Sequence, residues 1–261
     1  LAGSNALTLD GLVSGTSGLI KNGTANLTLN GANTFQGGTT LNAGGLILGS
    51  GTALGSGALT VGGASTLSGS GALTLNNAVH LNANLTLDAS NPLVLGGVID
   101  GTSGLIKNGT SSLTLSGNNS YQGTTALNAG SLIVGSNTAL GSGALNAAAG
   151  TTLDASAAVS LGNNLNLGGN LTLGGTQDLT LGGVINGVGG LIKNGAADLT
   201  LNGANGYLGN TALNAGTLIV GANGALGAGA LNAAAGTTLD ANTAVTLGNQ
   251  VNLAGALNIA G

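Results

Sequence analysis

The chain has 261 residues, of which 53 are Gly and only 4% are charged, and its formal net charge is −4. A single Pro and the absence of a Gly-X-Y period exclude collagen, and a hydrophobic fraction of 42% with so little charge is not typical of a disordered chain. Gly and Asn are poor helix formers, and Glu, Arg and Met are absent, which argues against a helical domain. Three lysines cannot form a basic patch, so we expect no nucleic acid partner, and no apolar run is long enough for a membrane-spanning helix.

An 86-residue repeat organises the whole chain. The string Gly-Leu-Ile-Lys-Asn-Gly begins at 18, 104 and 190, and the register between these copies holds without a gap. We therefore predict a single β-solenoid segment over residues 1–261, made of repeats at about 1–86, 87–172 and 173–258. Neither end resembles the capping repeat that closes a natural solenoid. We expect both ends to be uncapped, so that the segment continues in a longer chain or stacks on copies of itself.

The repeats contain short stretches in which apolar and polar residues alternate. In chain order these predicted strands are Leu-Thr-Leu at 7–9 and 27–29, Leu-Ile-Leu at 46–48, Leu-Thr-Leu at 73–75, Val-His-Leu at 79–81, Leu-Thr-Leu at 85–87 and Leu-Val-Leu at 93–95. Alternation places the two outer residues of each triplet on one face and the middle residue on the other. Pairs such as Asn22-Gly23 and Gly37-Gly38 lie between the strands, where they suit sharp corners.

The length of these strands decides between two all-β architectures. Asn-Gly pairs are also typical of β-hairpins, so an antiparallel meander is the alternative, but three-residue strands are too short for a stable hairpin array. We predict a right-handed parallel β-helix (β-solenoid) with about four coils of roughly 21 residues in each repeat. Leu should stack on Leu inside, and Thr and Asn should form ladders outside. Equivalent residues of successive repeats would then lie about 19 Å apart along one row.

Residues 18–46 resemble the autotransporter-associated β-strand repeat of type V secretion passenger domains. The resemblance rests on Gly18 to Gly23, on Leu27 to Thr39 with its Asn33 and Phe35, and on Ala43 to Leu46. The second and third copies keep Lys107, Lys193, Asn119, Asn205, Tyr121, Tyr207, Gly130 and Gly216, and depart at Gly38, which becomes Thr124 and Asn210. The resemblance implies a right-handed β-helix exported to the surface of a Gram-negative bacterium, with a signal peptide and a translocator barrel encoded elsewhere in the gene. It indicates a stalk and names no ligand.

Two positions that recur in all three copies are candidate binding residues. Lys21, Lys107 and Lys193 would form a row of cations for an anionic partner, or would be strand-edge lysines that discourage lateral aggregation. Phe35, Tyr121 and Tyr207 would form a ladder that stacks on sugars, or would pack over a corner of the solenoid. In both cases we expect the structural role, and Phe in place of Tyr suggests that the hydroxyl group is not required.

The acidic residues and the histidine form no recognisable catalytic or metal motif. The seven carboxylates are Asp10, Asp88, Asp100, Asp154, Asp178, Asp198 and Asp240. Glycoside hydrolysis needs two carboxylates about 5–10 Å apart, and the pair closest in sequence, Asp88 and Asp100, is separated by a Gly-Gly corner. His80 is the only histidine and has no Cys or Glu to complete a metal site. We therefore predict no catalytic, cofactor-binding or metal-binding residues and no enzymatic activity.

The function predicted from the sequence is mechanical. We expect a structural or adhesive stalk of a secreted or cell-surface bacterial fibre or autotransporter passenger that associates with copies of itself, end to end and laterally. Low surface charge favours such association. Surface glycans of a host or matrix are the other expected partners, and the alternative function is a non-enzymatic solenoid that binds carbohydrate or ice.

Overall fold

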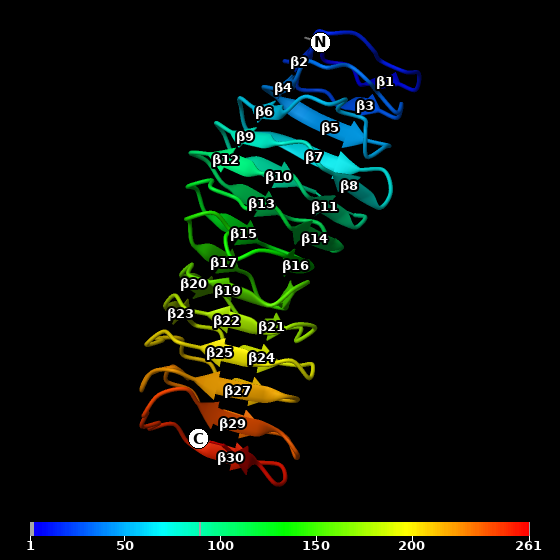
Figure 1. Cartoon of the computed structure of the whole chain (residues 1–261). Helices are drawn as coiled ribbons and strands as arrows, with labels where there is room; N and C mark the ends of the chain where they lie inside the picture. The colour runs from blue at the N-terminus through cyan, green and yellow to red at the C-terminus, as the bar shows by residue number, and fades with distance from the viewer. Residues whose placement is uncertain (1–2, 89, 261) are drawn as a thin grey trace. The chain divides into compact units, whose positions relative to one another are not determined.

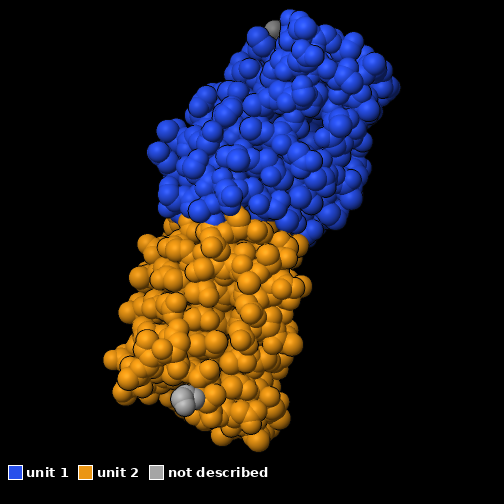
Figure 2. Space-filling model, in the orientation of Figure 1, with its two compact units in different colours: residues 1–130, 138–143 blue, residues 131–137, 144–261 orange. Residues whose placement is uncertain are grey.

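The computed structural model describes residues 3–88 and 90–260, and these residues form 31 β-strands joined by turns (Figure 1). No helix that could span a membrane occurs in this part of the chain. The chain divides into two compact units (Figure 2). Unit 1 comprises Leu1–Gly130 and Thr138–Gly143, and unit 2 comprises Ser131–Asn137 and Ala144–Gly261. The division falls inside the second repeat.

Unit 1 has three parallel sheets, because each coil contributes strands to successive faces. The first contains β1 (Leu7–Leu9), β3 (Leu27–Leu29), β5 (Gly44–Leu48), β7 (Ser65–Gly69), β10 (Leu85–Leu87), β13 (Leu105–Lys107) and β15 (Thr125–Leu127). The second contains β2 (Leu19–Lys21), β4 (Thr39–Leu41), β6 (Leu59–Val61), β9 (Val79–Leu81) and β12 (Ile99–Gly101). The third contains β8 (Leu73–Leu75), β11 (Leu93–Leu95) and β14 (Ser112–Leu115).

Unit 2 is built in the same way. Its first sheet contains β17 (Leu145–Ala147), β20 (Leu165–Leu167) and β23 (Ile185–Gly187). Its second contains β16 (Ser131–Val134), β18 (Thr151–Ala155), β21 (Leu171–Leu173), β24 (Leu191–Lys193), β26 (Thr211–Leu213), β28 (Leu231–Ala233) and β30 (Val251–Leu253). Its third contains β19 (Val159–Leu161), β22 (Leu179–Leu181), β25 (Leu199–Leu201), β27 (Thr217–Val220), β29 (Thr238–Ala241) and β31 (Asn258–Ile259).

The parallel β-solenoid predicted from the sequence is confirmed, and the antiparallel alternative is wrong. In unit 1, Leu7 pairs with Leu27 and Leu85 pairs with Leu105, and both pairings are parallel with an offset of 20 residues. A type I′ hairpin turn would require positive φ at both Asn and Gly, yet no non-Gly residue among those described has positive φ. The Asn-Gly pairs therefore form solenoid corners and not hairpins.

The coil length changes where the repeats place their residues. A coil of 20 residues is shorter than the expected 21, so an 86-residue repeat completes four coils and continues about a third of the way around the next. Equivalent strands therefore lie in different sheets. In unit 1, β2 and its equivalent β13 belong to different sheets, as do β17 and its equivalent β28 in unit 2. The expected row of equivalent residues about 19 Å apart is wrong.

Inward-facing Leu side chains form the core of each unit. In β3, Leu27 and Leu29 are buried and Thr28 between them is partly exposed, as the alternation predicts. Leu27 pairs with Leu7 on one side and with Leu46 on the other, so the apolar side chains stack from coil to coil. Burying one Leu side chain contributes about 1.5–3 kcal/mol.

The predicted Asn ladders are present on the outer surface. The Asn42 side-chain amide donates to Asn22 Oδ1 at 2.7 Å, one coil earlier. The equivalent bonds in the other copies run from Asn128 to Asn108 and from Asn214 to Asn194, each at 2.8 Å. Each bond adds a side-chain link between coils whose backbones are already paired.

Candidate functional site

The three repeat lysines are buried inside the coils. Lys21, Lys107 and Lys193 are 3%, 0% and 1% exposed. Each is the third residue of a Leu-Ile-Lys strand and so points inward, as the third residue of Leu-Thr-Leu does. They form neither a row of surface cations nor an aggregation-blocking edge, so both interpretations made from the sequence are wrong.

Backbone carbonyl groups surround each ammonium group. Lys193 Nζ donates to the carbonyl oxygens of Asn194 at 3.0 Å, Gly195 at 2.8 Å and Ala215 at 3.1 Å. Ala215 lies one coil further along the chain, so the lysine joins a corner to the next coil. Lys21 and Lys107 make the equivalent bonds, to Ala43 at 3.0 Å and to Ala129 at 3.2 Å as well as to Gly23 and Gly109.

Burial lowers the pKa of all three lysines, because the charged form loses hydration inside the coils. Nearby carboxylates oppose this effect: Asp88 raises the pKa of Lys107, and Asp198 and Asp178 raise that of Lys193. The carbonyl groups offer hydrogen bonds but no full negative charge. The lysines therefore serve as internal corner braces and are unavailable to an external ligand.

An inward-facing Asn, buried in the first two repeats and partly buried in the third, joins three coils in each repeat. Asn33 Oδ1 accepts a hydrogen bond from the Val13 backbone at 2.8 Å, and Asn33 Nδ2 donates to the Ala53 carbonyl at 2.7 Å. Val13 and Ala53 lie 20 residues before and after Asn33, so one side chain links the coils on both sides. Asn119 and Asn205 make the equivalent pairs of bonds.

The repeat aromatics pack inside a corner, as the structural interpretation predicted. Phe35, Tyr121 and Tyr207 are at most 1% exposed, so these rings cannot stack on a sugar from outside. The Gly one coil later makes room for each ring. A Cβ on Gly141, for example, would lie 3.0 Å from the Tyr121 ring and 2.2 Å from the Tyr121 carbonyl oxygen.

The hydroxyl group of each repeat tyrosine bonds the side chain of a Thr four residues later. In the first repeat the aromatic residue is Phe35, so the corresponding Thr lacks this partner. Tyr121 Oη lies 2.6 Å from Thr125 Oγ1, and Tyr207 makes the same contact with Thr211. Burial raises the pKa of both tyrosines to about 12. In the first copy Phe35 offers no hydroxyl group, and Thr39 Oγ1 is the one buried side-chain polar atom among the described residues without a partner. The suggestion that the hydroxyl group is not required therefore needs qualification: the fold accepts its loss but leaves Thr39 unpaired.

The acidic residues are spread over strands and corners of both units, and most of them accept hydrogen bonds. Asp10 accepts from Asn30 at 2.7 Å, Asp178 accepts from the Asp198 backbone at 2.9 Å, and Asp240 accepts from the Ala241 backbone at 2.7 Å. Asp88 follows β10 in the first sheet of unit 1, whereas Asp100 lies on β12 in the second sheet. The structure therefore does not bring this pair together as a glycosidase dyad.

His80 forms a surface pair with Asp100 on the neighbouring strand. His80 Nδ1 lies 2.6 Å from Asp100 Oδ1, and both side chains are about two-fifths exposed, at 43% and 42%. Within residues 3–88 and 90–260, no group of three or more His, Cys, Asp or Glu side chains could hold a metal ion. His80 and Asp100 are register partners on adjacent strands, as are Asn166 and Asn186, the residues 86 positions later.

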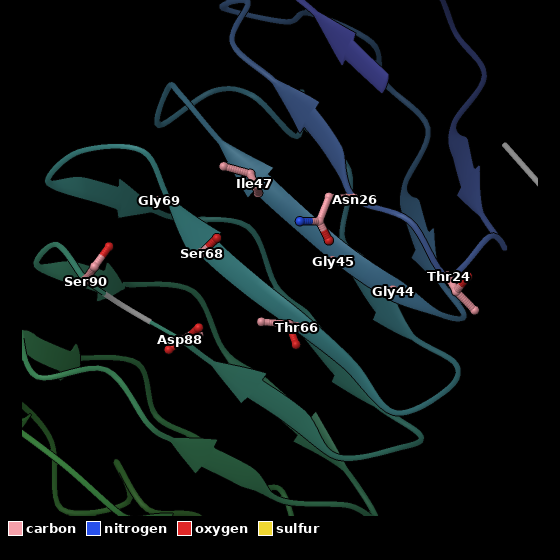
Figure 3. Close-up of a pocket in the computed structure, with 10 residues that line it drawn as sticks. All are labelled: Thr24, Asn26, Gly44, Gly45, Ile47, Thr66, Ser68, Gly69, Asp88 and Ser90. Atoms are coloured by element: carbon pink, nitrogen blue, oxygen red, sulfur yellow. The ribbon is translucent and has the colours of Figure 1, made fainter. Parts of the chain in front are cut away.

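One polar groove on unit 1 is a candidate ligand site that the sequence interpretation missed. It has a volume of about 620 Å³ and crosses the outer face of β5 and β7. In Figure 3, Asn26 lies at one side of the groove and Asp88 and Ser90 lie at the other. Ile47, Thr66 and Ser68 lie between them. The remaining lining residues are Thr24, Gly44, Gly45 and Gly69. Two glycines mark this groove in the sequence. Gly45 is replaced by Ser131 and Thr217 in the other copies, and Gly69 is replaced by Ala155 and Ala241.

Comparison with known proteins confirms the resemblance found in the sequence. A family model described as the passenger-associated-transport-repeat matches residues 19–48, 105–134 and 191–220. Each match covers the inward lysine, the bridging Asn and the buried aromatic residue described above. Three segments of the chain, one in each 86-residue copy, are thus similar to this repeat. No curated protein and no solved structure matches the chain.

We predict that Phe35→Tyr stabilises the protein. The new hydroxyl group would meet Thr39 as Tyr121 meets Thr125, which satisfies a buried polar atom and contributes about 1 kcal/mol to the free energy of unfolding. Urea denaturation monitored by circular dichroism would measure the change. Tyr207→Phe is the matched control and should lower the free energy of unfolding by a similar amount. Loss of stability in Phe35→Tyr would contradict the proposed pairing.

We predict that Lys193→Met lowers stability near neutral pH by about 1–3 kcal/mol, because three carbonyl groups lose their donor. The pKa of Lys193 is lowered in the folded state, so the unfolded state binds more protons as the pH approaches 10.5. The stability of the unsubstituted protein should therefore rise with pH in this range. Near pH 10 the two tyrosines oppose this rise, because their pKa is raised in the folded state, but they contribute equally in the unsubstituted protein and in Lys193→Met.

Urea denaturation at several pH values between about 8 and 10 would test this dependence. In Lys193→Met the rise should be smaller, because Lys21 and Lys107 alone would contribute to it. An identical pH dependence in the two proteins would show that Lys193 does not sit in the desolvated carbonyl site.

Proposed function

We propose that this chain, three segments of which are similar to the passenger-associated-transport-repeat, forms part of the stalk of a bacterial autotransporter and that the stalk associates laterally with copies of itself. A β-solenoid containing these repeats fits a passenger stalk, and the repeat indicates a secreted or cell-surface bacterial protein. Anchoring at the outer membrane of a Gram-negative cell and the adhesive role are parts of this proposal.

The observation that carries the proposal is the use of the repeat's polar residues inside the fold. The lysine and the asparagine of each repeat are hydrogen-bonded between coils, where they stabilise the stack, and the tyrosines of the second and third repeats bond a Thr side chain within their own coil. A repeat whose characteristic side chains hold neighbouring coils together provides stiffness and length. This is the expected design of a stalk, and it supports the prediction of a non-enzymatic role.

The burial of the lysines also supports self-association. All three lysines and both tyrosines are buried. Among the described residues, the ionisable side chains exposed to solvent are therefore those of Asp and His80. Few surface charges mean little electrostatic repulsion between neighbouring molecules. The outer face consists mainly of short polar side chains that can pack closely against another copy.

The outer columns of side chains do not favour ice binding. In the second sheet of unit 1 the outward residues are Ile20, Thr40, Thr60, His80 and Asp100, in that order. In the third sheet of unit 2, Thr180 and Thr200 are followed by Ile219 and Asp240. Ice binding would call for longer uninterrupted Thr rows, so lateral self-association is the better supported function.

Sedimentation velocity at a series of protein concentrations tests the association. We expect the weight-average sedimentation coefficient to rise with concentration. The double variant Thr180→Lys and Thr200→Lys should associate less, because it adds two like charges to an outer face. A single monomeric species at every concentration, including several milligrams per millilitre, would reject self-association.

A further inference from the structure

The groove over β5 and β7 differs from the equivalent surface of the second repeat. Gly45, on its floor, is replaced there by Ser131, and Asn26, on its wall, is replaced by Ser112. A Cβ on Gly45 would lie 2.3 Å from Asn26 Oδ1, so a larger residue at this position would force the Asn26 amide to shift. The first repeat therefore combines a larger polar side chain with a smaller floor residue.

The carboxylate also occupies a different place in the two repeats. In the second repeat Asp154 accepts hydrogen bonds from the Thr176 backbone at 3.1 Å and the Thr176 hydroxyl group at 2.5 Å, which joins the two sides of the equivalent surface. The residues 86 positions earlier are Ser68 and Ser90. The acid beside them is instead Asp88, whose equivalent 86 positions later is Gly174.

Asp88 is exposed in the groove, and its carboxylate has no hydrogen-bond partner among the residues that the structure describes. The side that Thr176 closes in the second repeat is thus left open in the first. An open carboxylate, an amide and several hydroxyl groups face the same volume. This arrangement leaves strong acceptors and donors available to a ligand.

We propose that this groove binds a neutral oligosaccharide. Asp88 and Asn26 would accept and donate hydrogen bonds to sugar hydroxyl groups, together with Thr66 and Ser68, and Ile47 would contact the apolar face of a ring. The volume of about 620 Å³ lies within the range of small-ligand sites. No cationic side chain lines the groove, and buried Lys107 offsets the Asp88 charge only in part, so the exposed carboxylate disfavours acidic sugars.

The proposal is independent of lateral association, because the groove lies within unit 1 and its polar side chains are partly or fully exposed in a single chain. A monomeric protein could bind sugar, and a filament could form without doing so. A binding measurement at concentrations where the protein is monomeric therefore separates the two proposals.

The test is a glycan array of neutral and sialylated oligosaccharides probed with the fluorescently labelled chain, followed by calorimetric titration of the best neutral oligosaccharide. Two variants install residues of the second repeat in the groove: Asp88→Gly, and the double variant Asn26→Ser with Gly45→Ser. Each should lower the affinity by roughly tenfold or more, because charged and amide hydrogen bonds to the sugar are lost. Asp10→Asn removes a carboxylate from another corner of unit 1 and should bind as the unsubstituted protein does.

Circular dichroism and thermal unfolding would show that the variants fold, as the natural presence of these residues in the second repeat leads us to expect. Three results would overturn the proposal. These are the absence of binding to any neutral oligosaccharide, a preference for sialylated oligosaccharides, and an affinity that the two groove variants leave unchanged.

Discussion

Parallel hydrogen bonding between strands about 20 residues apart is the constraint on which the rest of the structure depends. A three-residue strand is too short to be stable alone, but here its backbone pairs with strands on both sides and its Leu side chains stack with theirs. Every other feature must keep that spacing. Close approach between the corners of neighbouring coils explains much of the glycine content, since a Cβ on Gly57 would lie 2.5 Å from the backbone of Gly37.

The buried polar residues solve a problem that this architecture creates. Corners leave backbone carbonyl and amide groups inside the coil without ladder partners, and a buried unpaired group costs about 1–3 kcal/mol. Lys193 satisfies three carbonyl groups, and Asn33 satisfies an amide on one side and a carbonyl on the other. The motif that defines the repeat is thus a set of corner partners. Outer positions differ between the copies, as at Asp88, whose equivalent 86 residues later is Gly174.

Much of the fold could be predicted from the sequence, because alternating triplets such as Leu27-Thr28-Leu29 specify which residues face inward. The same rule would have placed Lys21 inside, but its charge suggested a surface position, and only the corner carbonyl groups explain how it is accommodated. The coil length could not be predicted, since it depends on how many residues each corner uses. A coil of about 21 residues would place equivalent residues of successive repeats in one row. The observed coil of 20 residues places them on different sheets. The groove required side-chain geometry, although Gly45 and Gly69 mark it as a departure from the other copies.

Disulfide cross-linking tests the 20-residue parallel register most directly, because the chain contains no Cys and introduced pairs would have no competitors. Thr40 and Thr60 are outward-facing register partners on β4 and β6, and Thr180 and Thr200 are partners on β22 and β25. Adjacent strands are about 4.8 Å apart, within the Cα separation that a disulfide spans. Cys at either pair should cross-link under mild oxidation, whereas Cys at Thr28 and Thr40, on consecutive strands of different sheets, should not. Efficient cross-linking of Thr28Cys with Thr40Cys, and none at the two register pairs, would indicate an antiparallel meander and contradict the solenoid.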